Sequence, residues 1–166
     1  MAKLLHWVSA LLLVGLVIAG LIIAGMERGP EKKELEGIHI SVGLVLLALM
    51  TLRLVWKLRN PAPADPVDVP GWQNTTAFLT HWGLYAAIYF QITVGILGEG
   101  QRPIAFFGLF EFGPLLEPNE ARHELFEELH ETGWIVIAVL TGVHVLAALY
   151  HHFIRKDNVL RRMTTG

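Results

Sequence analysis

The stretch that decides the fold covers residues 132–154 and reads TGWIVIAVLTGVHVLAALYHHFI. A membrane-spanning helix needs about 20 mostly apolar residues, and this stretch is long and apolar enough to form one. Three histidines nevertheless lie inside it: His152 and, on one face of the helix, His144 and His151. An ionisable side chain at membrane depth is costly unless it has a partner. His144 and His151 are therefore candidates for a functional site buried in a membrane.

The composition of the whole chain points to the same class of protein. Hydrophobic residues make up 53% of the 166 residues and charged residues only 17%, and the mean hydropathy is +0.47. These values are typical of membrane proteins rather than of soluble domains. The sequence predicts a single domain over residues 1–166, an all-α transmembrane four-helix bundle. The four spans are expected at about 8–25, 38–56, 78–97 and 132–154.

The charges outside the spans predict the orientation of the bundle. With the amino terminus inside, the inner face carries eight basic and three acidic residues, and the outer face carries five basic and twelve acidic residues. Because an excess of Lys and Arg marks cytoplasmic loops, both termini are predicted to be cytoplasmic. In an alternative interpretation, residues 3–25 are a cleavable signal peptide, since Lys3 precedes an apolar run that ends in small residues. We favour a span, because the run is longer than a usual signal core and cleavage would discard His6.

Two connectors differ from the spans in composition. Residues 57–77 contain four prolines, which predicts an extended linker on the inner side. The outer loop, residues 98–129, begins with the aromatic stretch IAFFGLFEFGPLL, which we expect to lie at the membrane interface and to cap the bundle. It continues with the acidic stretch NEARHELFEELHE, whose spacing predicts a short amphipathic helix. His123, within that acidic stretch, is expected to be solvated.

The spacing of the histidines predicts two facing pairs. His130 and His144 are 14 residues apart, which is nearly four helical turns, so both project from one side of the last span, about 21 Å apart. They cannot share one metal ion. Because successive helices run in opposite directions, His6 enters the first span at the level of His144, and His39 enters the second span at the level of His130. The predicted pairs are His6 with His144 and His39 with His130.

Two imidazoles from different helices are a ligand set that suits iron porphyrin better than zinc, which prefers four ligands. The chain contains no cysteine, which excludes thiolate ligands and covalent c-type haem attachment. We therefore predict two non-covalently bound haem b groups. Arg53 follows His39 by 14 residues on a similar face and is a candidate partner for a haem propionate; it could equally be a snorkelling anchor at the inner surface. Small residues near the ligands would let a flat macrocycle approach the backbone, although glycine also eases helix packing in membranes.

Other histidines allow two readings. For His81, His151 and His152, a hydrogen-bonded place in the bundle interior or at its surface competes with a role in binding. A further alternative for the function of the whole chain is a small-ion transporter. It is disfavoured because ion relays usually rely on carboxylates, and no Asp or Glu falls within the four spans.

Over nearly its whole length the chain resembles the bacterial cytochrome b561 family, which includes a di-haem superoxide oxidase of bacterial inner membranes. The matching segments are LLHW around His6, IHISVGLVLLALMTLRLVW from Ile38, THWGLYAAIYF from Thr80, the FFGLFEF stretch, LHETGW around His130 and, most specific, GVHVLAALYHHFIRKDNVLRRM from Gly142.

The resemblance implies a multi-pass protein of the bacterial inner membrane with two b haems. It implies four axial ligands, which are His6, His39, His130 and His144. It also implies a site for ubiquinone or a related quinone near the inner haem, formed by His81 and His151. Histidine suits such a site, because a quinone that takes electrons must also take protons, and imidazole exchanges protons near neutral pH.

The sequence departs from the family pattern in three places. Ile92 stands where family members usually have a proline that kinks the third helix. Asp65 and Asp68 stand in the linker where the superoxide oxidase has lysines. The outer face is acidic, whereas superoxide is an anion and would be attracted by a basic funnel.

The predicted function is transfer of electrons across the bilayer from a periplasmic donor, with superoxide as the leading specific donor, to membrane quinone. The alternative is a non-enzymatic haem subunit that links a separate periplasmic dehydrogenase to the quinone pool.

Overall fold

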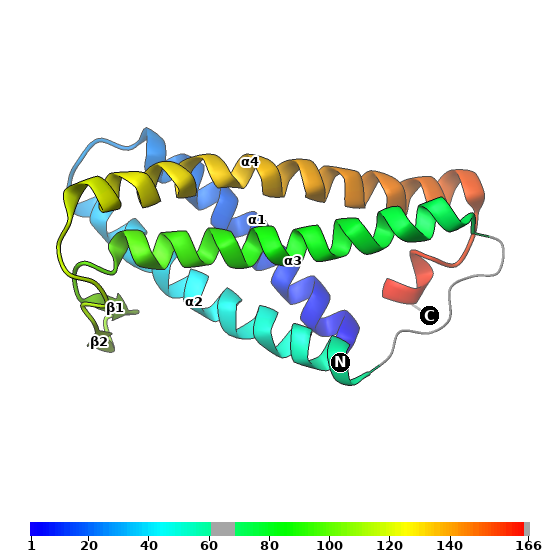
Figure 1. Ribbon diagram of the computed structural model, residues 1–166, viewed down its shortest axis with the longest axis horizontal. Coiled ribbons are helices and arrows are strands. Elements are labelled where there is room, and N and C mark those ends of the chain that lie inside the picture. The colour runs from blue at the N-terminus through cyan, green and yellow to red at the C-terminus, as the bar shows by residue number, and fades with distance from the viewer. Residues whose placement is uncertain (61–68, 165–166) are drawn as a thin grey trace.

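The computed structural model describes residues 1–60 and 69–164. Within these residues four long helices run back and forth, with a small β-hairpin at one end and two short helical turns at the carboxyl end (Figure 1). The elements are α1 (Ala2–Gly25), α2 (Pro30–Arg59), α3 (Gly71–Glu99), β1 (Ile104–Phe106), β2 (Phe110–Phe112), α4 (Glu120–Tyr150), the π-helical turn η1 (His151–Arg155) and the 3-10 turn η2 (Arg161–Met163).

The all-α architecture with four helices agrees with the prediction. Among the described residues, three helical segments are long and apolar enough to cross a membrane: α1, α2, and α4 together with η1. The predicted span at 78–97 falls within α3, which is equally long but is not one of these three. Polar side chains such as His81 and Gln91 lower the mean hydropathy of α3. The helix is uninterrupted at Ile92, which is buried in the core.

All four helices begin well before the predicted spans, at Ala2, Pro30, Gly71 and Glu120. Pro30 occupies the first turn of α2, where its missing N–H costs nothing. The acidic stretch that we predicted as a separate short helix is instead the first part of α4, so that prediction was wrong. The side chain of Asn119 caps this helix by accepting a hydrogen bond from the backbone N–H of Arg122 at 3.0 Å, and Glu120 in the first turn complements the helix dipole.

The bundle consists of two helix pairs. α1 packs along α2, and α3 packs along α4, whereas contact between the two pairs is much sparser. A cluster of buried side chains joins the pairs near the middle of the bundle; its members are Leu46, Met50, Tyr85, Ile88, Ile92 and Ile137. The four helices therefore leave room between the pairs on either side of this central cluster.

The aromatic stretch of the outer loop forms the β1–β2 hairpin, which the sequence did not predict. Three residues, 107–109, connect the paired strand ends Phe106 and Phe110. Phe107 and Gly108 both have positive φ, and the backbone N–H of Leu109 donates to the carbonyl of Phe106 at 2.9 Å to close the turn. Ser41 of α2, fully buried, fixes the hairpin: its hydroxyl donates to the carbonyl of Gly37 at 2.8 Å and accepts from the N–H of Phe107 at 2.9 Å. The hairpin thus covers one end of the bundle.

The carboxyl end of the chain folds back onto the amino end. Lys156 adopts a left-handed conformation after η1, and the chain reverses there. The indole N–H of Trp7 donates to the carbonyl of Met163 at 2.9 Å, and the Lys3 ammonium donates to the carbonyl of Thr164 at 3.4 Å. Both chain ends therefore lie at one end of the bundle, away from the hairpin (Figure 1).

Residues 61–68 of the proline-rich linker lie outside the described residues. They include Pro61, Pro63, Asp65, Pro66 and Asp68. Pro70, the last of the four prolines, precedes the first turn of α3.

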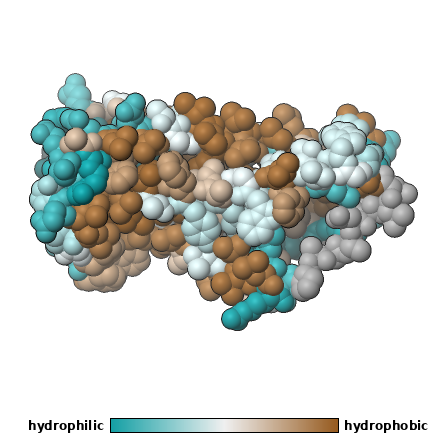
Figure 2. Space-filling model, viewed as in Figure 1, coloured by the Kyte–Doolittle hydropathy of each residue, from teal (hydrophilic) through white to brown (hydrophobic). Residues whose placement is uncertain are grey.

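The surface matches a protein that crosses a bilayer. In Figure 2 apolar residues cover the middle of the molecule, and hydrophilic residues gather at its left-hand end. That end holds the start of α4 with its glutamates (Figure 1). Side chains such as Leu11 and Leu146 are 71% and 67% exposed, which is favourable in lipid but not in water.

Candidate functional site: two imidazole pairs

The first pair, nearer the hairpin, joins α2 to α4. The ring centres of His39 and His130 are 6.0 Å apart, with their planes at 84°. Both side chains are half-buried. The structure therefore brings together two histidines that are 91 residues apart in the sequence, at the level that the helix spacing predicts.

A double hydrogen bond to α3 holds His130. Its Nδ1 lies 3.0 Å from the backbone carbonyl of Gln91. Because a carbonyl only accepts, Nδ1 carries the proton and Nε2 keeps its lone pair. The Gln91 side chain returns a hydrogen bond from Nε2 to the backbone carbonyl of His130 at 2.7 Å. Metal-binding histidines commonly donate the proton of the second ring nitrogen to a carbonyl, so this arrangement prepares His130 Nε2 as a ligand.

Two glycines make this close approach of α3 and α4 feasible. A Cβ at Gly95 would lie 2.8 Å from both Cε1 and Nδ1 of His130. A Cβ at Gly133 would collide with the side-chain oxygen of Gln91. Hydrophobic patterning does not reveal such contacts. The signal in the sequence that could have indicated this contact is a polar residue, Gln91, at membrane depth.

Replacing Gly95 by alanine should therefore displace the His130 ring and break its bond to Gln91. We expect reduced occupancy, or an altered absorption spectrum, of the haem nearer the hairpin, while the other haem is unchanged. Gly142→Ala is the matched control, because nothing lies within 4 Å of a Cβ at Gly142. Absorption spectra of the purified variants test this; equal spectra for Gly95→Ala and the wild type would contradict it.

A cavity of about 370 Å³ surrounds the His39/His130 pair, within the usual size range of ligand pockets. All four helices line it, mostly with apolar side chains. Gly20 and Gly43 form part of the wall, and a Cβ at Gly43 would meet open space. The end of the cavity towards the start of α4 is polar, and its charged side chains include Lys32, Glu36, Glu127 and Glu131.

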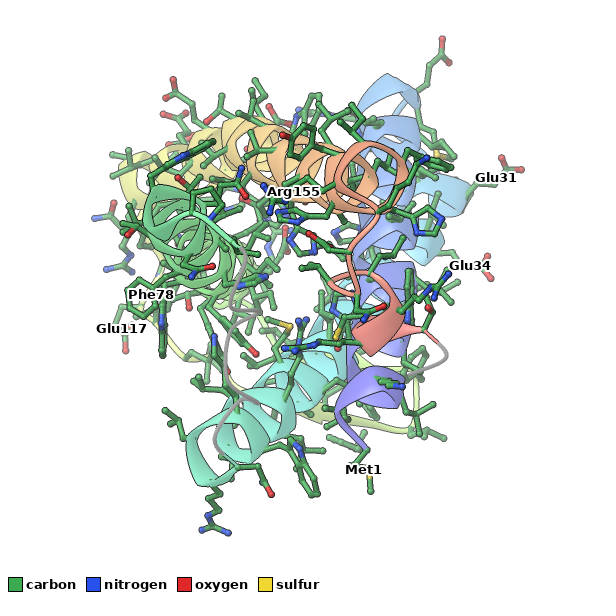
Figure 3. All side chains as sticks on the ribbon, turned by 90° about the vertical axis from the view of Figure 1, so that its right-hand side faces the viewer. Met1, Glu31, Glu34, Phe78, Glu117 and Arg155 are labelled. Carbon is green, nitrogen blue, oxygen red and sulfur yellow. The ribbon has the colours of Figure 1, made fainter. Side chains whose placement is uncertain are left out.

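The second pair, nearer the chain termini, joins α1 to α4. The ring centres of His6 and His144 are 6.1 Å apart, at 65°. His81 of α3 also lies against His144, with ring centres 5.2 Å apart. Viewed from this end, nitrogen-bearing side chains gather in the space between the helices, whereas Glu31 and Glu34 point outward (Figure 3).

The separations within the pairs fit a shared metal ion. A first-row metal ion binds an imidazole nitrogen at about 2.0–2.1 Å, and a ring nitrogen lies roughly 1.2 Å from the ring centre, so two rings on opposite sides of one ion have centres about 6.4 Å apart. The values for His6/His144 and His39/His130 are close to this distance. The 5.2 Å between His81 and His144 is shorter. His6 and His144 would therefore hold such an ion better than His81 and His144, and His81 is a neighbour of the pair.

Unpaired ring nitrogens also fit such a group. Nδ1 of His6 and Nδ1 of His39 are buried and have no hydrogen-bond partner among the described residues. Leaving a buried polar atom unpaired costs about 1–3 kcal/mol, and a bond from the ring to a metal ion would offset this cost. Each pair offers two imidazoles and no carboxylate; in the described part of the chain, no three His, Asp or Glu side chains are grouped to hold a metal ion. Each pair would therefore suit the iron of a porphyrin, which needs few ligands from the protein.

Two cations of α2 lie near the second pair. Arg53 is close enough to His6, His81 and His144 to interact with each electrostatically, and its guanidinium lies 5.5 Å from the centre of the Tyr85 ring. The Lys57 ammonium lies over the ring of Trp82, at 4.7 Å. No carboxylate of the described residues forms an ion pair with Arg53. A half-buried guanidinium of this kind is a suitable partner for a propionate.

The structure separates His151 from His81. Among the described residues no hydrogen bond or ring contact joins them; His151 instead pairs with Asp157, whose Oδ2 lies 2.6 Å from Nδ1. His123, which we expected to be solvated, has a side chain that is 37% exposed, and its Nδ1 also lies 2.8 Å from the carbonyl of Gly98 at the end of α3. It lines the cavity described above.

Comparison with known proteins identifies the family of the chain. Residues 1–166 match the profile of the family described as prokaryotic cytochrome b561. The chain is 32% identical over 163 residues to cytochrome b561 homolog 1 of Escherichia coli (strain K12), covering 96% of this chain and 92% of that protein. It is 29% identical over 163 residues to the probable superoxide oxidase CybB of Yersinia pestis, covering 96% and 90%. The family profile matches the full length of the chain, and the structure has long apolar helices and two imidazole pairs. The chain belongs to the prokaryotic cytochrome b561 family.

Proposed function

We propose that this membrane cytochrome carries two haem b groups and transfers electrons from a periplasmic donor to membrane quinone. The observation that carries the proposal is the presence of two imidazole pairs at two levels of one bundle, His39/His130 and His6/His144. Their positions on α4 are separated by about 21 Å along the helix axis. Two redox groups at these levels would connect one side of the membrane to the other.

Haem supplies the one-electron chemistry, because its iron changes between the ferrous and ferric states. The chain's own residues fix the positions of the two groups. His130 presents Nε2 because Gln91 binds its Nδ1 proton, and the glycines of the cavity wall admit a flat ligand. Arg53 balances a propionate charge near the second pair, and the central cluster between the levels excludes water.

We infer that quinone is reduced near the second pair by way of His81 and His151. The support is chemical: His81 lies against His144, and Nε2 of His151 has no hydrogen-bond partner among the described residues. A quinone that takes two electrons needs two protons to become the neutral quinol. Both histidines can hydrogen-bond a quinone carbonyl and deliver such protons.

The orientation in this proposal places both termini in the cytoplasm. The support is the basic bias of the termini and the linker in the sequence. The chain ends lie together at the end of the His6/His144 pair. Quinone reduction would then take up protons on the cytoplasmic side, and the hairpin and the start of α4 would face the periplasm.

Superoxide is the first donor we propose, because a relative carries the name probable superoxide oxidase. A second candidate is a haem subunit that accepts electrons from a periplasmic dehydrogenase. The polar end of the cavity favours this second function, because four glutamates line the cavity against a single lysine, Lys32; they are Glu36, Glu99, Glu127 and Glu131. This charge would repel an anion and attract a basic protein surface.

One preparation tests these assignments. The purified protein in lipid nanodiscs is reduced with dithionite, and added ubiquinone should reoxidise its haems; persistent ferrous spectra would overturn quinone reduction. A superoxide source should in turn reduce the oxidised haems. No reduction by superoxide, combined with co-purification of a dehydrogenase from native membranes, would assign the second function instead.

The orientation is tested in whole cells. Because the chain has no cysteine, Glu120→Cys introduces a single thiol at the start of α4. A membrane-impermeant maleimide should label it from outside. Labelling only after the cells are opened would reverse the donor and acceptor sides.

A further inference from the structure

The chain makes a sharp reversal directly after α4, and this reversal brings a carboxylate to His151. Residues His151–Arg155 form a π-helical turn, and Lys156 then adopts φ 56°. The backbone N–H of Asp157 donates to the carbonyl of His151 at 3.2 Å. This returns the Asp157 side chain to the histidine, with Oδ2 2.6 Å from Nδ1. Single π-helical turns inside or at the end of α-helices frequently occur at functional sites.

The carboxylate is held on both oxygens. Oδ1 accepts from the backbone N–H of Val159 at 3.1 Å, and Oδ2 also accepts from Nε of Arg155 at 3.3 Å. Burial alone would raise the pKa of Asp157, but the hydrogen bonds from His151, Val159 and Arg155 outweigh it and lower the pKa below its ordinary value. The side chains of His151 and Asp157 are 12% and 18% exposed. An ionised, largely buried acceptor therefore faces Nδ1.

This geometry fixes the proton on one nitrogen of the ring. A carboxylate only accepts hydrogen bonds, so His151 Nδ1 carries a proton. Nε2 is then the ring nitrogen that can take up or release a proton towards a substrate. The same division of roles holds in hydrolases in which a buried aspartate fixes the tautomer of a catalytic histidine.

We propose that Asp157 is a positioning residue for quinone reduction, which holds His151 with Nδ1 protonated so that Nε2 delivers a proton to the quinone. The inference rests on the proposed function. For each quinol formed, the quinone gains two protons and two electrons, which the bound haems would supply one at a time. His151 gives one proton from Nε2 to a carbonyl oxygen and regains one from cytoplasmic water; the second proton reaches the other carbonyl oxygen from cytoplasmic water on the His81 side of the site. Asp157 stays ionised throughout and exchanges no proton.

The C-terminal tail gives this arrangement a support on α1. The Trp7 indole donates to the carbonyl of Met163, six residues after Asp157. The reversal is therefore held in place on both sides: it continues directly from α4, and the hydrogen bond from Trp7 of α1 holds the chain that follows it. A fixed support of this kind keeps the carboxylate in place when the substrate enters or leaves.

Stopped-flow oxidation of the dithionite-reduced protein in nanodiscs by a short-tailed ubiquinone tests the inference. Asp157→Asn keeps the shape of the side chain but can donate to Nδ1 and so favour the other tautomer. We expect haem oxidation to slow by about tenfold to a hundredfold, with both haem spectra unchanged. Asp157→Glu, which restores a carboxylate, should recover part of the rate. Asn158→Ala is the matched control in the same turn, because the exposed Asn158 contributes a backbone acceptor to Arg162 that alanine keeps.

A double variant separates positioning from a structural role. Because Asp157 acts through His151, His151→Ala combined with Asp157→Asn should be no slower than His151→Ala alone. A double variant slower by the product of the two effects would overturn the inference, and so would loss of a haem spectrum or an unchanged rate in Asp157→Asn. Failure of ubiquinone to oxidise the wild type would instead refute the proposed function itself.

Discussion

Replacing His130 by alanine is expected to remove one haem b and leave the other. The His39/His130 pair and the His6/His144 pair lie on opposite sides of the central cluster, so each pair should load independently. His39→Ala should give the same spectrum as His130→Ala, and His6→Ala the same as His144→Ala. Reduced-minus-oxidised spectra and redox titration of the four variants measure which haem remains.

Another histidine of the last helical segment, His152, serves as the matched control. It stacks edge-on against Phe153 and belongs to neither pair. Alanine at this position should leave the content of both haems intact. The assignment of the pairs would be refuted if variants of different pairs, such as His39→Ala and His144→Ala, removed the same haem.

Replacing His81 by alanine should have the largest effect on turnover without loss of a cofactor. Its ring centre lies 5.2 Å from that of His144, closer than two axial ligands of one ion would be. We therefore expect His81→Ala to keep both haem spectra and to slow haem oxidation by ubiquinone by about a hundredfold, in the range of a lost general acid.

The contrast with His6→Ala makes this result decisive. His6 has the ring separation expected of an axial partner, so its loss should remove a haem, whereas the loss of His81 should not. The opposite outcome, with the haem kept in His6→Ala and lost in His81→Ala, would exchange the two roles. Oxidation of His81→Ala at the wild-type rate would remove His81 from the quinone site.

The positions of the paired histidines could be predicted because they follow from simple rules. Helix pitch sets the separation of His130 and His144, and the alternating direction of the spans assigns His39 and His6 to their levels. Hydropathy located the lipid-facing parts of the helices. Helix pitch and the order of the spans can both be read from the sequence, and the ring contacts within the bundle agree with the levels that they predict.

The helix ends and the supporting residues could not be predicted in the same way. The acidic first part of α4 carries no apolar signal, and its start is set by the Asn119 cap. Gln91 and Gly95 support His130 through a helix–helix contact that hydropathy does not encode. Asp157 reaches His151 only because the chain reverses at Lys156, and a reversal at a non-glycine residue has no clear sequence signature.

The central claim is that one chain holds two b haems, and the haem-to-protein ratio of the purified wild type tests it most directly. Pyridine haemochrome analysis measures the haem, and quantitative amino-acid analysis measures the protein. Two imidazole pairs predict two haem b groups per chain. A ratio of one haem per chain would contradict the account, because one of the two pairs would then have no metal to bind.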